Sequence, residues 1–110
     1  MTGLARIYLN RGHELYEMGL LGKAEEDFSR SLAQQPDYGP AYHNRGMARF
    51  FQKNYPAALA DFDAAILLTP DQLPPYAGRA MVLDRVGRKD EASKAYAAAC
   101  KLGWKAVCKE

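Results

Sequence analysis

A period of 34 residues constrains the fold of this chain more than any other feature of its sequence. The repeated set consists of small residues, an aromatic ring and, in two copies, a proline. Its three copies are Gly12, Ala24, Phe28 and Pro36; Gly46, Ala58, Phe62 and Pro70; and Ala80, Ala92 and Tyr96. A fixed period of this length indicates a repeat architecture, in which each unit packs mainly against its neighbours.

Apolar residues recur at three- and four-residue steps along the whole chain, which predicts helices rather than strands. Glycine and proline clusters separate these segments and mark the turns between them. The expected helices run from about 4 to 18, 23 to 34, 40 to 52, 55 to 68, 75 to 86 and 91 to 102. Asp90 is expected to cap the sixth helix, and residues 104–109 are expected to add one or two helical turns.

The amino-acid composition limits the classes of function that this chain can have. The chain has 110 residues, 48% of them hydrophobic and 25% charged, which is typical of a globular protein. Its net charge is +2, and lysine and arginine are interspersed with acidic residues, which argues against nucleic acid as a partner. Since no apolar run approaches the roughly 20 residues that span a bilayer, no membrane insertion is expected. Whether this is a whole protein or a fragment stays open.

The sequence carries no signature of an enzyme. It contains no phosphate-binding loop, no paired metal motif and no nucleophile elbow. The expected function is therefore non-catalytic and needs no cofactor.

The repeated set resembles the signature of the tetratricopeptide repeat family, W-x2-L-G-x2-Y, A-x3-F and P over 34 residues. The second unit shows it well, with Tyr42-x2-Arg45-Gly46, Ala58-x3-Phe62 and Pro70. The resemblance covers nearly the whole chain and implies an all-α, right-handed solenoid of three antiparallel helix pairs with a short C-terminal capping helix. The expected units of this single domain are 5–38, 39–72 and 73–103, and the cap spans 104–110.

In this family the first helix of each unit lines a concave groove, so the resemblance implies a module that binds a protein or peptide there. The side chains expected to face the groove are Asn10, His13, Tyr16, His43, Asn44, Met47, Phe50, Phe51, Met81 and Arg85. Methionine and exposed phenylalanine make an adaptable apolar floor, and asparagine can both donate to and accept from a peptide backbone. In the alternative reading, Phe51 packs on the neighbouring unit and the groove is an ordinary surface.

One partner class is disfavoured by the same resemblance. Family members that hold acidic C-terminal peptides of chaperones use a clamp of lysine, asparagine and arginine side chains. The matching positions here are Leu9, His13, Asn44, Pro74 and Gly78. Since only Asn44 agrees with the clamp, a C-terminal acidic peptide is not expected to bind.

Arginine and aspartate also recur with the period, at Arg11, Arg45 and Arg79 and at Asp27 and Asp61. A repeated arginine could serve an anionic ligand. We expect ion pairs between neighbouring helices instead, because partly buried charges are usually paired.

Two other functions compete with groove binding. In a self-assembling scaffold, the exposed end helices of the solenoid would stack on another copy, giving a homo-oligomer. In a small metal protein, His13 and His43 would need a third ligand, for which Asp84 is the nearest candidate. The second is disfavoured, because two unassisted histidines on helices are usually surface residues.

Cys100 and Cys108 are the only cysteines. In one straight helix they would lie about 12 Å apart, too far to bond, but a break at Gly103 would let them meet. The surrounding residues resemble the A-C-x-L-G and A-C pattern of Sel1-like repeats, in which such pairs are disulfides. A disulfide implies an exported or periplasmic protein, whereas two reduced thiols in a core imply a cytoplasmic one.

Overall fold

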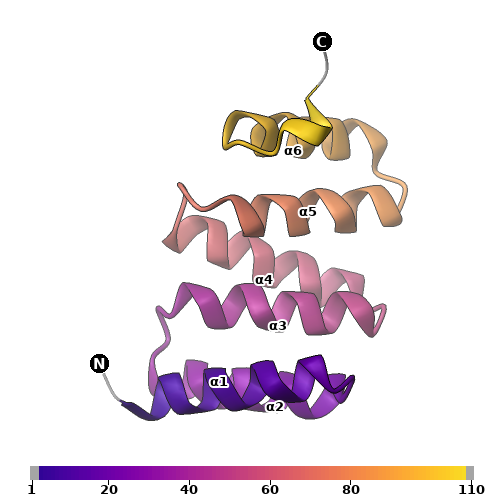
Figure 1. The fold of residues 1–110 in the computed structure, drawn as a ribbon. Coiled ribbons are helices and arrows are strands. Elements are labelled where there is room, and N and C mark those ends of the chain that lie inside the picture. The colour runs from indigo at the N-terminus through magenta and orange to yellow at the C-terminus, as the bar shows by residue number, and fades with distance from the viewer. Residues whose placement is uncertain (1–2, 109–110) are drawn as a thin grey trace.

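The computed structural model describes residues 3–108 of the chain. In this range it contains six α-helices, one 3-10 turn and no strand. Their bounds are α1 Gly3–Glu17, α2 Leu21–Gln34, α3 Gly39–Phe51, α4 Tyr55–Leu68, α5 Leu73–Arg85, α6 Lys89–Lys101 and η1 Lys105–Val107. Consecutive helices form antiparallel pairs that stack into an elongated body, with the two termini at opposite ends (Figure 1). The predicted all-α solenoid of three helix pairs is confirmed.

Glycine occupies the positions in two of the turns where the backbone adopts a left-handed conformation. Gly19, between α1 and α2, has a φ of 80°, and Gly87, between α5 and α6, has a φ of 84°. One predicted cap is wrong: α6 begins at Lys89 with Arg88 in the capping position, so Asp90 lies inside the first turn. Its carboxylate still suits that turn, because the N-terminal end of a helix carries a partial positive charge.

Phe28 and Phe62 hold the helices together at close approach. Both side chains are fully buried. A Cβ atom added to Gly12 would lie only 2.6 Å from Cε1 of Phe28, and one added to Gly46 only 2.9 Å from Cε1 of Phe62. The rings therefore occupy space that a side chain on the facing helix would take, which explains why small residues recur with the period.

The predicted arginine–aspartate pairs are confirmed in the first two helix pairs. Arg11 Nε lies 2.7 Å from Oδ2 of Asp27, and Arg45 Nη2 lies 2.8 Å from Oδ1 of Asp61. The third pair differs, because Ala95 stands where the period would place an aspartate. Arg79 turns instead to Asp63 on α4 of the preceding pair, at 2.7 Å.

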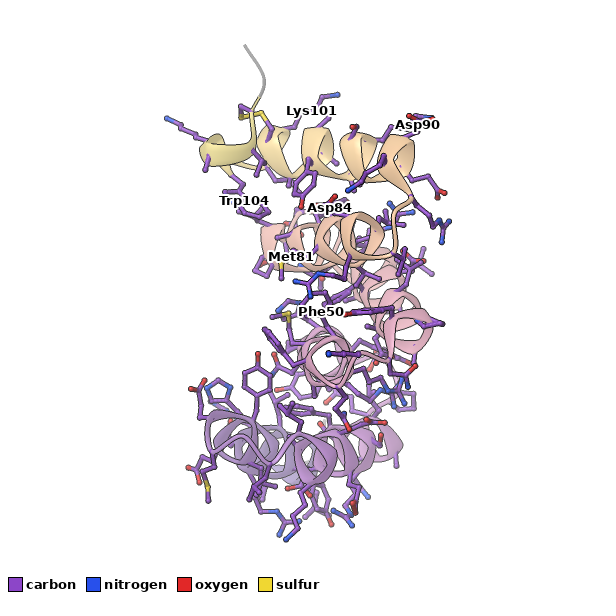
Figure 2. All side chains as sticks on the ribbon, turned by 90° about the vertical axis from the view of Figure 1, so that its right-hand side faces the viewer. Phe50, Met81, Asp84, Asp90, Lys101 and Trp104 are labelled. Atoms are coloured by element: carbon purple, nitrogen blue, oxygen red, sulfur yellow. A yellow bond between two sulfur atoms is a disulfide. The ribbon has the colours of Figure 1, made fainter. Side chains whose placement is uncertain are left out.

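The C-terminal segment folds back over α6. Gly103 has a φ of 115° and ends the helix, and the ring of Trp104 then packs against Tyr96 with centroids 6.1 Å apart. Cys100 and Cys108 are joined by a disulfide that spans this turn, with Cα atoms 5.0 Å apart (Figure 2). The expected capping helix is thus the short 3-10 turn η1, and its predicted last residues, 109–110, lie outside the described range.

We expect purified protein that has never been reduced to show no reactive thiol under denaturing conditions, because both sulfur atoms are bonded to each other. A colorimetric thiol titration in denaturant measures this, and a sample reduced beforehand should react with two equivalents. Two equivalents in the unreduced sample would contradict the disulfide and favour a reducing compartment.

Among the helices of the described range, none has both the length and the apolar character needed to cross a membrane.

Candidate functional site

A hollow of about 190 Å³ opens between α1 and α3 on the inner surface of the solenoid. It brings together five of the predicted groove residues, two from α1 and three from α3. They are His13, Tyr16, His43, Asn44 and Met47, and Phe28 from α2 completes the lining. The period placed the ring of Phe28 in the core, and sequence reasoning missed that this buried ring also borders the hollow.

A second hollow, of about 270 Å³, lies on the other side of His43 and Asn44. It is formed where α3 and α5 begin and where the loop after α4 passes between them. Its lining consists of Gly39, Pro40, His43, Asn44, Thr69, Gln72, Pro74 and Pro75. Sequence reasoning missed this hollow, because it read the prolines only as helix starts. His43 and Asn44 border both hollows and lie between them, and we call the two hollows together the groove.

Phe50 lies in the core and Phe51 lies on the surface. This corrects the prediction that both side chains face the groove. Phe50 is only 4% exposed and packs in the core with Phe62 and Val82, so it does not form the groove surface. Phe51 is 51% exposed and lies against Tyr16, with ring centroids 6.1 Å apart. The period carries a signal for this difference, because the residues equivalent to Phe51 are Glu17 and Arg85, both charged and exposed.

Three further predicted residues lie outside both hollows, as Phe50 and Phe51 do. Asn10 is exposed on α1, and Met81 packs against the core beside Phe50 (Figure 2). The guanidinium of Arg85 lies over the ring of Phe50, 5.3 Å from its centroid. These three residues can extend the groove but do not form its centre.

The histidines and Asp84 do not come together as metal ligands. The carboxylate of Asp84 accepts hydrogen bonds from Lys89 Nζ at 2.7 Å and from the hydroxyl of Tyr96 at 3.4 Å. Within residues 3–108, no group of three histidine, cysteine, aspartate or glutamate side chains is placed to hold a metal ion. His13 instead stacks on Tyr16 at 6.4 Å, as part of the groove wall.

His43 lies at the centre of the groove, and its imidazole is mostly enclosed. Its Nδ1 atom is buried without a hydrogen-bond partner among the described residues, and its ring lies 5.6 Å from that of Phe62. Removal from water disfavours the charged imidazolium, so burial lowers the pKa of His43 below its ordinary value of 6.5. The groove therefore presents a neutral histidine at neutral pH.

We expect the folded protein to lose stability as the pH falls below about 6.5, because the unfolded chain then binds a proton on His43 that the folded chain resists. Above that pH the histidine is neutral in both states and the loss disappears. The slope of the free energy of unfolding can reach about 1.4 kcal/mol per pH unit for one proton. Urea denaturation between pH 5 and pH 8 (about three pH units) measures this slope.

His43→Gln should flatten the slope, and His13→Gln, on an exposed side chain, is the matched control. The ion pair between Arg11 and Asp27 lowers the pKa of that carboxyl below 3.8, so its loss destabilises the fold only in a more acidic window. If the slope is unchanged in the His43→Gln variant, His43 is not the group that causes it.

A family model described as "Tetratricopeptide repeat" matches residues 5–38 and 39–72, which is more than half of the chain. Among curated proteins, the chain is 32% identical over 68 residues to "Protein O-mannosyl-transferase TMTC1" of Mus musculus, covering 62% of this chain and 7% of that protein. It is 40% identical over 72 residues to "Protein FlbA" of Caulobacter vibrioides, covering 63% of this chain and 12% of that protein. The chain thus spans only about a tenth of the length of such relatives.

Solved structures share the whole arrangement, including the third helix pair. The first TPR of Spaghetti (RPAP3) bound to HSP90 peptide SRMEEVD superposes with a TM-score of 0.91 at 20% identity, over 94% of this chain and 82% of that one. The second TPR of Spaghetti (RPAP3) gives a TM-score of 0.87 at 25% identity, over 90% of this chain and 92% of that one. The repeat match, the three stacked helix pairs and these superpositions show that the chain belongs to the tetratricopeptide repeat family.

Proposed function

We propose that this chain is a non-catalytic protein-interaction module that binds an extended peptide segment of a partner protein in its groove. The observation that carries the proposal is the pair of hollows on either side of His43 and Asn44. Each is smaller than the ≈ 300–1,000 Å³ typical of small-molecule sites, so each suits one side chain of a peptide better than a cofactor.

Asn44 is the residue best placed to hold the peptide backbone between the two hollows. It borders both, and its amide can donate to a carbonyl and accept from an N–H of an extended chain. Met47 borders the first hollow, the exposed ring of Phe51 lies against Tyr16 of that hollow, and the prolines that begin α5 border the second hollow. Apolar side chains of the ligand would pack there, because the hollows are lined mostly by carbon atoms.

The relatives support peptide binding as the general role. The second TPR of Spaghetti (RPAP3), 25% identical to this chain, is bound to the HSP90 peptide SRMEEVD. That ligand contains three acidic residues, whereas the groove of this chain holds no lysine in either hollow. We therefore propose a ligand with apolar side chains and without an acidic C-terminal cluster.

Gly78 gives a steric reason for this preference. It occupies one of the positions at which clamp-containing relatives carry a basic side chain. A Cβ atom at Gly78 would lie 2.4 Å from Cε1 and 2.5 Å from Cζ of Phe62. Because Phe62 is fully buried, a side chain at Gly78 would force the core apart.

A random-peptide display selection on wild type, with Asn44→Ala/Phe51→Glu as the counter-selection, tests the proposal. We expect enriched peptides that carry apolar residues at two positions and that lose at least about tenfold in affinity on the groove variant, equal to about 1.4 kcal/mol. Leu67→Glu, on an α4 side chain that is 84% exposed, is the matched control and should bind as wild type does.

Fluorescence anisotropy with a labelled SRMEEVD peptide gives the second readout. Wild type should show no saturable binding of this peptide. Tight binding of SRMEEVD, or enriched peptides that bind the groove variant and wild type equally, would overturn the proposed site.

A further inference from the structure

One face of α1 carries a regular seam of exposed side chains. Its residues are spaced by three and four positions alternately, so they fall on a single side of the helix. We call this set the α1 seam; it consists of Leu4, Ile7, Arg11, Glu14 and Met18, the last lying just past the helix end. The three apolar members are 48%, 59% and 69% exposed in that order.

The 34-residue period shows what such a seam does elsewhere in the chain. The residues equivalent to Ile7 and Glu14 are Ala41 and Ala48 on α3, both of which are fully buried. Ala48 packs on Ala24 and Phe28 of the preceding helix pair. The same face of the first helix is thus a helix-packing surface, and on α1 no helix within residues 3–108 covers it.

The two charged residues of the seam have polar groups that can still bind a partner. Arg11 uses Nε and Nη2 to bind both carboxylate oxygens of Asp27, at 2.7 and 2.8 Å, which fixes the guanidinium and leaves Nη1 available. On α3 the equivalent Nη1 of Arg45 donates to Ser29 of the preceding pair at 3.1 Å. Glu14, one helical turn after Arg11, is exposed and forms no ion pair within the described residues.

We propose that the α1 seam is a docking surface for a second copy of this chain, with the two α1 helices antiparallel about a two-fold axis between residues 12 and 13. In this register Arg11 faces Glu14 of the partner subunit, and Ile7 faces Met18 of the partner subunit. Two-fold symmetry repeats each contact, so both charges and both apolar ends are matched twice. A parallel pair would place Arg11 against Arg11 of the partner subunit, with like charges opposed.

The opposite end of the solenoid is a poorer partner for the α1 seam. There η1 and Trp104 already lie over Tyr96 of α6, in the place where a following helix would pack. A head-to-tail stack of α1 on α6 would have to displace them, whereas α1 against α1 requires no rearrangement of the described residues.

The dimer should be weak. The helix has 15 residues and is about 22 Å long, so it cannot bury the roughly 800 Å² per partner of a standard stable interface. We therefore expect dissociation constants in the micromolar range. Sedimentation equilibrium from about 1 µM to about 1 mM protein covers that range and should show a monomer–dimer exchange.

Two variants of exposed residues test the surface without changing the fold, which circular dichroism verifies. Glu14→Arg places two arginine pairs in opposition and should weaken the dimer at least about tenfold, and Ile7→Glu should do the same by charging the apolar contact. Leu67→Glu, on α4 and 84% exposed, is the matched control and should dimerise as wild type does. A wild type that stays monomeric throughout, or a dimer that survives both seam variants, overturns the proposal.

Cross-linking tests the register. A mixture of Ile7→Cys and Met18→Cys proteins should form a heterodimeric disulfide under mild oxidation, because those positions face each other across the axis. Ile7→Cys alone should cross-link far less, since two copies of residue 7 lie near opposite ends of the paired helices. Equal cross-linking in the two samples contradicts the antiparallel register, and wild type under the same oxidation controls for exchange with the native disulfide.

Discussion

Replacing Phe62 with alanine is expected to lower the free energy of unfolding by about 3–5 kcal/mol. The side chain is fully buried and contacts helices of two successive pairs, next to Gly46 on α3 and Gly78 on α5. Its removal leaves a cavity that the rigid helix stack cannot close. Urea denaturation followed by circular dichroism measures the loss.

Phe51→Ala is the matched control, because the same ring is removed from a side chain that is 51% exposed. It should cost less than about 1 kcal/mol. If Phe62→Ala is too unstable to study, since whole domains are stable by only about 5–15 kcal/mol, Phe62→Leu gives a smaller loss in the same direction. Equal losses at positions 51 and 62 would refute the central place of Phe62 in the core.

Gly78→Ala tests the same contact from the other side. In wild type the added methyl group meets the Phe62 ring at 2.4 Å, so overpacking should cost about 1–3 kcal/mol. In the Phe62→Ala background the ring is gone, and the same change should become stabilising by up to about 1 kcal/mol through helix propensity. A double-mutant cycle reveals this change of sign. An effect of Gly78→Ala that is identical in both backgrounds would mean that the two residues do not compete for space.

Replacing Asp61 with alanine is the second change expected to have a large effect, a loss of about 3 kcal/mol. The carboxylate is 3% exposed and accepts from Arg45 Nε at 3.0 Å and from Arg49 Nη1 at 2.9 Å. Breaking a buried pair typically costs about 3–5 kcal/mol. The lower end applies, because the two guanidinium groups retain 17% and 20% exposure and can bind water.

Asp63→Ala provides the control, since Asp63 pairs with Arg79 at 2.7 Å but is 52% exposed. Such a surface pair is worth about 0–1 kcal/mol. Replacing Arg45 and Asp61 together, Arg45→Met with Asp61→Leu, should recover part of the loss, because Arg45 is then gone and Arg49 keeps its ion pair with Glu25 at 3.1 Å. Chemical denaturation compares all three proteins. A loss at Asp63 as large as that at Asp61 would show that burial does not set the cost.

The sequence predicted the aromatic contacts and two of the arginine–aspartate pairs, but it did not predict the third arginine's partner. The period placed Phe28 and Phe62 opposite small residues, and it paired Arg11 with Asp27 and Arg45 with Asp61. It could not predict the partner of Arg79, because Ala95 breaks the period and the choice of Asp63 depends on how α5 sits against α4. A long arginine side chain reaches several positions, and only the packed helices select one of them.

The candidate site was likewise predicted only in part from the sequence. Sequence reasoning selected His13, Tyr16, His43, Asn44 and Met47, and these residues line one hollow. It could not separate Phe50 from Phe51, because neighbouring residues on a helix differ by only about 100° and both are apolar. The packing of Phe50 on Phe62 and Val82 decided which ring is buried. The second hollow likewise depends on the loop at Thr69 and Gln72, whose position follows from the stacking of α3 on α5.

The sequence by itself determined that this chain forms three helix pairs and where small residues let the helices approach. Those properties follow from local periodicity and from the 34-residue repeat, because each unit must bury the same apolar face. Only the tertiary structure decided the position and size of the two hollows, the burial of His43 and the exposure of the α1 seam. These depend on distances between residues far apart in the chain, which are set by how the helix pairs stack.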